Sequence, residues 1–459
     1  MKYKFKKSHL YISIIILMMP IFVPGVIFAE IIKDNVMSLS IEDAVKIAIK
    51  NNKSIQIQEQ RVASARADIL YTKSLFLPQV NTGYGYTYTD SVFSTSSTGI
   101  LGSSGRKDPR IYFGFKNDNS FNISAEESIY NGGANIALLN QAKLGLKVET
   151  ETLRAAKLDV EYDTKRLFYG ILLAYENKRI AQDLVNQAKA HYDTVKMKFD
   201  QGTTSKFDLL QSKVQVSKLI PQLVNAENAI DLLMSEFKKL LSLDMTSPVT
   251  ISGHLEYTLV DIRESEFLQT AYQNKPEMIL KKLGIDINKW SIEFAKSGWL
   301  PQVSANAEYI YRSNDIGRMV NTRHDNWNAG VKVGIAIFDG FSTKAKVDQA
   351  KAGYGQAILE KEDVAERIAV EIRDACLNLK EAKAIIDSQK DSVDEAKEAL
   401  RLSEERYKNG VGINLDVLDA EVSLAQVEQN LAQGIYDYIL ANAQLDKTMG
   451  TEFLKEGSK

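Results

Sequence analysis

The fold of this chain is decided by residues 365–407, which read AERIAVEIRDACLNLKEAKAIIDSQKDSVDEAKEALRLSEERY. Read in steps of three and four residues, one face of this stretch is apolar except at two positions, Gln389 and Ser403. Its members are Ala365, Ile368, Ile372, Ala375, Leu379, Ala382, Ile386, Gln389, Val393, Ala396, Leu400, Ser403 and Tyr407. A heptad pattern sustained over this length predicts a coiled-coil helix. No proline interrupts 342–407, and at about 1.5 Å per residue this helix measures roughly 100 Å.

The same pattern occurs a second time, 208 residues earlier. Its face comprises Val160, Leu167, Ile171, Ala174, Ala181, Val185, Ala188, Tyr192, Val195 and Phe199, with Lys157, Thr164 and Lys178 as polar members. Each long helix is followed by a turn, which contains Gly202 in the first copy and Gly410 and Gly412 in the second, and then by a returning helix. We therefore predict a tandem duplication of one long helical hairpin.

The duplication suggests a division of the whole chain. We expect a signal peptide at 1–29, a first repeat at 30–241, a connector at 242–262, a second repeat at 263–449 and a C-terminal tail at 450–459. Each repeat should contain a helix, two strands and a long helical hairpin. The first helix should begin near Ser40, which forms a capping box with Asp43, and continue through Ala67. The corresponding helix of the second repeat should cover 266–297, with a break near Pro276.

The N-terminus has the composition of a secretory signal. Lys2, Lys4, Lys6 and Lys7 precede an apolar run at 11–28, and Ala29 ends an acceptable cleavage site. A retained membrane anchor is the alternative. Removing the four lysines would take the net charge from −2 to −6, a mildly acidic balance that gives no reason to expect nucleic acid as a partner. The single cysteine, Cys376, cannot form an intrachain disulfide and is expected to pack in the core.

Four segments have the two-residue period of β-strands. Leu-Pro-Gln-Val begins the first and third strands, at Pro78 and Pro301, and the exit turns contain Gly132, Gly133 and Gly340. A Ser-, Thr- and Gly-rich loop is expected at 91–118. The expected apolar faces are Val80, Thr82, Tyr84, Tyr86 and Tyr88; Phe121, Ile123 and Ala125; Val303, Ala305, Ala307, Tyr309 and Tyr311; and Trp327, Ala329, Val331, Val333, Ile335 and Ile337. The opposite faces carry small or polar residues, and only Glu127 falls on the apolar side against this pattern.

Strands of this kind are typical of a transmembrane barrel with lipid outside and water inside. Four strands cannot close on themselves, and an open edge in hydrocarbon leaves backbone groups unpaired. The chain is therefore expected to oligomerise. Two copies would give eight strands with a nearly filled bore, and three would give twelve with room for water.

These residues together resemble the TolC-type outer-membrane efflux proteins. The resemblance is carried by Ser38-Leu39-Ser40, the paired Leu-Pro-Gln-Val sequences, the turn at 130–133 and the segment 407–420, which ends in Asp-Val-Leu-Asp-Ala. It implies a homotrimer with a twelve-stranded barrel in outer-membrane lipid and a twelve-helix periplasmic tunnel. It also implies an inner-membrane transporter and a periplasmic adaptor as partners, with the adaptor facing the turns at Gly202, Gly410 and Gly412. The lack of an acylated cysteine resembles the unlipidated branch of the family.

The resemblance also assigns roles to residues near the hairpin turns. Asp416 and Asp419, three residues apart on one helix face, would line the periplasmic entrance, with Asp208 and Gln211 at the equivalent places of the first repeat. Six acidic groups in a trimer would favour cations. Acids in a first helical turn also stabilise the helix dipole, so a purely structural role is the alternative. Asp208 and Tyr407 match the family's gate latch, but Gly412 stands where the family has arginine, and Lys206 or Asn414 are the candidate substitutes.

The sequence gives no sign of enzyme chemistry. His191, His254 and His324 are scattered without metal-ligand spacing, so no metal site and no cofactor are predicted. Gly410-Val411-Gly412 lacks the preceding strand and following lysine of a phosphate loop. The expected function is a passive exit duct for efflux or type I secretion. The alternative is a periplasmic coiled-coil adaptor or scaffold, which would need no amphipathic strands and would be soluble as a monomer.

Overall fold

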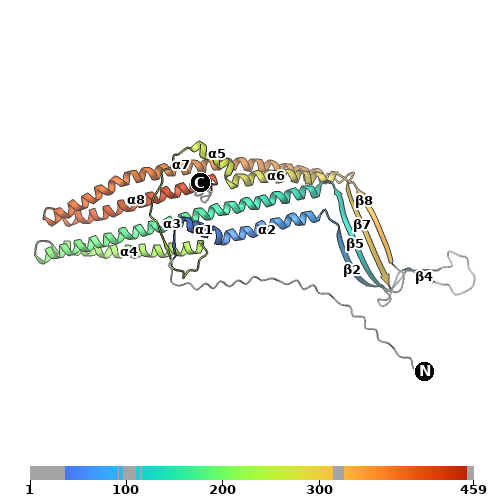
Figure 1. Ribbon diagram of the computed structural model, residues 1–459, viewed down its shortest axis with the longest axis horizontal. Helices are drawn as coiled ribbons and strands as arrows, with labels where there is room; N and C mark the ends of the chain where they lie inside the picture. Colours follow the sequence, from blue (N-terminus) through green and yellow to red (C-terminus); the bar gives the residue numbers. More distant parts are fainter. Residues whose placement is uncertain (1–36, 91–92, 97–109, 114–115, 314–324, 452–459) are drawn as a thin grey trace, which may run out of the picture.

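The computed structural model describes residues 37–90, 93–96, 110–113, 116–313 and 325–451. The expected signal peptide and most of the expected tail lie outside these residues. The described part is long and thin, with helical hairpins at one end and a sheet at the other (Figure 1). This arrangement confirms the predicted fold class of long helical hairpins combined with a few strands.

Two helical hairpins dominate the molecule. The first hairpin consists of α3 (Ala134–Asp200) and α4 (Lys206–Leu240), and the second of α7 (Ser342–Lys408) and α8 (Asn414–Met449). Both long helices have 67 residues, and the second agrees with the helix predicted over 342–407. The two hairpins lie side by side, and both turns point to the same end (Figure 1).

The predicted apolar face of α7 forms the core of the second hairpin. Ile368, Ile372, Leu379 and Ile386 are fully buried there. They pack against Tyr438, Ala441 and Leu445 of α8 in one cluster. The two polar members of the face, Gln389 and Ser403, are only partly buried, and the face is most tightly packed from Ile368 to Ile386.

Shorter helices extend the hairpins toward the sheet. In the first repeat they are α1 (Ile41–Asn51) and α2 (Lys53–Ser74), and in the second α5 (Glu264–Asn274), α6 (Pro276–Lys296) and a 3-10 turn (Ser297–Trp299). The predicted Ser40 cap is confirmed, since Asp43 N–H donates to Ser40 Oγ at 3.2 Å. The prediction of one continuous first helix is wrong.

The break in that helix falls at Asn52. Its Oδ1 accepts from Ser54 N–H at 2.8 Å, which caps α2, and its Nδ2 donates to Leu240 O at 2.9 Å. The second repeat breaks at Lys275, before the predicted Pro276, with nearly the same backbone angles. An asparagine whose side chain caps the next helix thus replaces the proline.

Four antiparallel strands form the main sheet in the order β2-β5-β7-β8. Their bounds are Gln79–Tyr88, Asn117–Asn131, Gln302–Ser313 and Asp325–Gly334. The register confirms the predicted faces, because Thr82, Ile123, Tyr309 and Trp327 stand side by side across all four strands. Glu127 pairs with Ala305 and so lies on the apolar face, as its parity predicts.

The strands differ from prediction at their ends. The fourth strand stops at Gly334, so Ile335 and Ile337 fall beyond the sheet. A register shift between Ser128 and Tyr130 adds one residue to β5, as a β-bulge does. The expected loop at 91–118 contains a two-stranded ribbon, β3 (Phe93–Ser96) with β4 (Arg110–Phe113), and its last residues already belong to β5.

The connector also contains a β-strand that its sequence does not predict. Its strand β6 (Val249–Ile251) pairs in parallel with β1 (Met37–Leu39). Leu39 is buried there with Val249, Phe237 and Phe168, so the connector is fixed against the base of the first hairpin. No helix in the part of the chain that the structure describes combines the length and the apolar composition that crossing a bilayer requires.

Candidate functional site

The two hairpin turns have the same geometry. Gly202 has φ 74° and Gly410 has φ 76°, a left-handed conformation that residues with a side chain rarely adopt. In each turn a following N–H bonds back to a carbonyl near the helix end, Thr203 to Lys198 O and Val411 to Arg406 O, both at 2.9 Å. These bonds satisfy carbonyls that the helix leaves free. Because they form only when the turn residue is left-handed, glycine is favoured at both turns.

Gly412 is needed for a different reason. Its N–H donates to Arg406 O at 3.0 Å, and a Cβ placed on it would lie 3.0 Å from both Arg406 Cβ and Tyr407 N. The space beside the end of α7 is therefore nearly filled. A side chain at this position would require its neighbours in the turn to move by a few tenths of an ångström.

A chain of polar side chains joins the two hairpins just inside the turns. His191 Nε2 of α3 lies 2.7 Å from Asn414 Oδ1 of α8, and Asn414 Nδ2 donates to Gln211 Oε1 of α4 at 3.1 Å. Because the Asn414 amide donates to Gln211, its oxygen accepts, and the network assigns the proton to Nε2 of His191. Burial lowers the pKa of His191, so the imidazole is neutral in this packing.

Tyr407 lies beside this chain at the end of α7. It is buried, its ring centroid is 5.1 Å from that of His191, and Lys198 Nζ of α3 stands 4.4 Å from its centroid. Lys198 Nζ also donates to the carbonyl oxygens of Tyr407 and Lys408. Lys198 therefore links the first hairpin to the second, because its charge faces an aromatic ring and bonds two carbonyls at the C-terminus of α7.

The predicted latch residues Tyr407 and Asp208 come together without a direct bond. Burial raises the pKa of the Tyr407 phenol, the Thr204 hydroxyl lowers it, and the charge of Asp208 raises it. No hydrogen bond of good geometry reaches the buried phenol oxygen from the described residues. Asp208 Oδ2 accepts from Thr204 Oγ1 at 3.0 Å and Ser205 Oγ at 2.8 Å, in a capping box that begins α4.

The four residues expected at the entrance therefore divide into two pairs. Asp208 and Gln211 are half-buried and bonded inside the chain. Asp416 and Asp419 are exposed, and no hydrogen bond or ion pair engages either carboxylate among the described residues. Of the substitutes considered for the missing arginine, Lys206 is exposed, whereas Asn414 is buried in the polar chain. The free carboxylates of Asp416 and Asp419 can bind ions or a neighbouring copy. Asp208 could do so only after giving up its hydrogen bonds within the chain.

The turns between sheet and helices also use left-handed glycines. Gly132, Gly133 and Gly340 all have φ between 66° and 85°. A Cβ on Gly132 would lie 2.4 Å from Ser297 O, so the first exit turn also depends on close backbone approach. Pro78 and Pro301 each stand directly before a strand, at the start of β2 and β7.

The caps after these turns are equivalent in the two repeats. Asn131 accepts from Asn135 N–H at 3.1 Å, and Asp339, 208 residues later, accepts from Thr343 N–H at 2.8 Å. The first turn of each long helix is therefore stabilised in the same way, by a side chain that accepts from the backbone N–H four residues later.

Sequence reasoning missed three residues of the site. The sequence gives His191 no role beyond lacking metal-ligand spacing, and it does not single out Lys198 or Glu421. Glu421 is 1 % exposed in α8, and neither carboxyl oxygen has a hydrogen-bond partner among the described residues. The signal was available for Glu421, since it continues the apolar face of Val417 and Leu424 at helical spacing.

Helical hairpins continue into a sheet that has one apolar face and, among the described strands, two unpaired edges, an arrangement that suits a membrane channel. The comparisons with known proteins agree. The family model for the outer membrane efflux protein matches residues 44–235 and 267–451. The chain belongs to this family, whose members are channels and not enzymes.

Individual relatives are distant but cover most of the chain. Outer membrane protein TolC of Vibrio cholerae serotype O1 is 22% identical over 408 residues, 86% of this chain and 87% of the relative. Alkaline protease secretion protein AprF of Pseudomonas aeruginosa is 20% identical over 91% of this chain and 86% of its own. The crystal structure of the Campylobacter jejuni CmeC outer membrane channel matches with a TM-score of 0.75 at 19% identity, over 91% of this chain and 88% of that one.

Proposed function

We propose that the protein is the outer-membrane channel of a tripartite efflux or type I secretion system, a passive duct that carries substrates from an inner-membrane pump to the outside. The sheet is the observation that carries this proposal. Val80, Tyr84, Trp327, Val331 and Val333 are exposed on its apolar face, although each is a large hydrophobic side chain. Such a face is stable in lipid and costly in water.

Completing the barrel requires further copies. The sheet order leaves β2 and β8 each with one unpaired edge among the described strands, and an open edge is not tolerated in hydrocarbon. Three copies would join edge to edge into twelve strands and bring twelve helices into a tunnel. Glu127 stands at the end of β5 nearer the helices, which would place it at the membrane interface where a charge is tolerated.

The entrance of the duct would be the ring of hairpin turns. Three copies place Asp416 and Asp419 around one mouth, and their free carboxylates would favour cations over anions. The turns at Gly202 and Gly410 would face the periplasmic adaptor and the transporter. Opening would separate the second hairpin from the first at the Tyr407 and Asn414 contacts.

The expected signal peptide completes the proposal, because the chain must be exported to reach the outer membrane. The substrate is open between two classes. Among the relatives, AprF is named for secretion of alkaline protease and others for efflux. Efflux and secretion both need a passive conduit, so we propose the conduit and leave the substrate class open.

Membrane fractionation and bilayer recording test this function. The full chain should appear in the outer-membrane fraction as a detergent-dependent, heat-modifiable trimer. The purified trimer should give stepwise conductance in planar bilayers. A monomer that remains soluble without detergent after cell lysis contradicts the channel and supports the scaffold.

A further inference from the structure

Glu421 is an acid in a place where its neighbours are apolar. On the same face of α8, Val417 is fully buried against Leu400 and Tyr407, and Ala425 packs with Ile180 and Leu184 of α3. Glu421 lies between these two clusters and is 1 % exposed. An unpaired carboxylate in such surroundings is strongly disfavoured.

The charges around Glu421 do not neutralise it. On α7, Glu404 is itself an acid and pairs with Lys408 at 3.5 Å, while Arg401 pairs with Glu398 and Glu405, both at 2.6 Å. Lys397 is 3.9 Å from Glu428 of α8. These are the charges that α7 and α8 bring to this level, and every cation among them is engaged by another acid.

The first hairpin offers no counter-charge either. On α3, Asp183 is an acid bonded to Arg179, His191 is held neutral by burial, and Lys198 is bound to carbonyls near the turn. On α4, Asp208 is another acid, tied into its cap. Among the described residues, the one charge that acts strongly on Glu421 is therefore that of another acid, Glu404.

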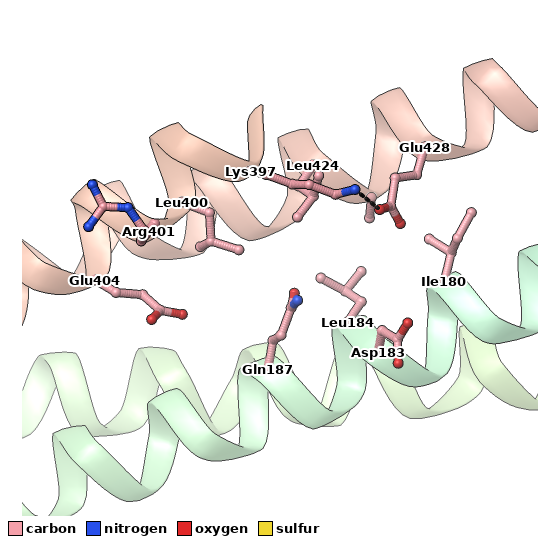
Figure 2. Close-up of a pocket in the computed structure, with 11 residues that line it drawn as sticks. Ile180, Asp183, Leu184, Gln187, Lys397, Leu400, Arg401, Glu404, Leu424 and Glu428 are labelled. Carbon is pink, nitrogen blue, oxygen red and sulfur yellow. Dashed lines mark ion pairs between the residues drawn. The ribbon is translucent and has the colours of Figure 1, made fainter. Parts of the chain in front are cut away.

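A cleft beside this position separates the two hairpins. It has a volume of about 320 Å³ and is lined from both hairpins. Figure 2 shows Gln187 of α3 and Glu404 of α7 facing one another across it, with Leu424 of α8 beside them. Leu424 is three residues from Glu421, so the buried acid lies close to this cleft between the hairpins.

The duplication makes Glu421 specific to the second hairpin. Its counterpart 208 residues earlier is Lys213, which is exposed. Of the two returning helices, α8 therefore carries a buried acid at this position and α4 does not. Of the two hairpins, the second would be the one whose packing responds to protons.

We propose that Glu421 is a proton-controlled lock between the hairpins: as the neutral acid it allows α8 to pack against α3 and α7, and its ionisation loosens that packing. The consequence for conduction rests on the proposed channel function, whereas the change in packing does not. In the proposed channel the packed state would be the closed duct, so loss of the proton should favour opening.

The direction of the pH effect follows from burial. Burial first, and then the charge of Glu404, raise the pKa of Glu421 from 4.5 to about 7. The packed state therefore binds more protons than a separated state in which Glu421 is solvated. Between pH 4.5 and about pH 7, the ratio of packed to separated molecules falls as pH rises, by up to about tenfold per pH unit. His191 has the opposite effect on the packed state. Burial lowers the pKa of His191, so at pH values below its ordinary pKa the protonation of His191 disfavours the packed state.

Spin labels on the two turns can measure the packing directly. Gln201→Cys and Asn409→Cys are exposed positions, one in each turn, and would be labelled in the full chain with Cys376→Ala. Double electron–electron resonance from pH 5 to pH 8 should show the longer separation gaining at least about tenfold in population. Glu421→Gln, which keeps the shape of the neutral acid, should hold the shorter separation throughout.

A matched variant and a second measurement separate the possible results. Glu395→Gln removes an exposed acid of α7 and should keep the wild-type response. A wild-type chain without pH response, or Glu421→Gln with the full response, overturns the lock. Absence of conductance at every pH, with the spin-label response intact, would instead reject the channel and leave the lock standing.

Discussion

His191 Nε2 on α3 lies 2.7 Å from Asn414 Oδ1 at the start of α8, which joins the first hairpin to the second by a buried hydrogen bond. The two residues are 223 positions apart in the chain. Asn414 also bonds Gln211, so one amide connects three helices. Asn414 is the first residue of α8, two positions before Asp416 of the proposed entrance, so this contact lies beside that entrance.

Asn414→Ala should weaken the link between the hairpins. The change leaves the buried His191 N–H without an acceptor, which costs about 1–3 kcal/mol. We expect a lower midpoint of thermal unfolding, or a leakier channel, measured by circular dichroism and by the resting conductance. Asn430→Ala, at an exposed position on the same helix, is the control and should change neither. Equal behaviour of the two variants would remove Asn414 from the gate.

Asp416→Ala combined with Asp419→Ala should reduce the cation preference of the channel. Their carboxylates are exposed and bonded to nothing in the described chain, so their charge is free to act on passing ions. Reversal potentials in asymmetric KCl measure the effect. Asp391→Ala with Asp394→Ala is a matched pair of exposed acids at the same spacing on α7. Unchanged selectivity in the first pair contradicts the assigned constriction.

Gly412→Arg should not restore the family's latch. The new side chain would begin 3.0 Å from Arg406 Cβ and Tyr407 N, so the turn must shift to accept it. We expect lower stability than wild type, by about 1–3 kcal/mol for an overpacked site. Denaturant unfolding of the detergent-purified protein measures it. Gly145→Ala in α3 is the comparison, because no heavy atom lies within 4 Å of its Cβ position and it should be neutral or stabilising. A tighter closed state in Gly412→Arg would show that the turn adapts.

Val331→Arg should prevent assembly of the barrel. Val331 is exposed on the apolar face of β8, and an arginine on a lipid-facing position costs about 2–4 kcal/mol at the membrane centre. The amount of heat-modifiable trimer in the membrane fraction reports the effect. Asn328→Arg lies on the opposite face of the same strand, so it should assemble and change only conductance. If both variants assemble equally, the apolar face does not meet lipid.

Much of the fold could be predicted because local patterns dictate it. The heptads of α7, the break at Pro276 and the alternation of the four strands depend on neighbours a few residues away, and all are confirmed. The break at Asn52 was missed because its cause is a side chain that caps one helix while bonding Leu240 of another. The pairing of Met37–Leu39 with β6 was missed for the same reason, since a parallel pair is formed by segments far apart in sequence.

The site shows the same limit at single residues. The sequence placed Tyr407, Asp208, Asp416 and Asp419 near one end, because the duplication aligns both turns. It could not show that Gln211 bonds Asn414, because that contact joins residues 203 positions apart on different hairpins. It also could not show that a Cβ at Gly412 would crowd Arg406 and Tyr407, which depends on the exact path of the turn.

The sequence by itself determined the periodicity of this protein: long helices with one apolar face, strands with one apolar face, and a duplication that sets both hairpins at one end. Periodicity states which residues share a face. Only the tertiary structure decided what covers each face. Glu421 is buried and Lys213 is exposed because α8 packs against both α7 and α3, whereas the equivalent face of α4 lies open in the single chain.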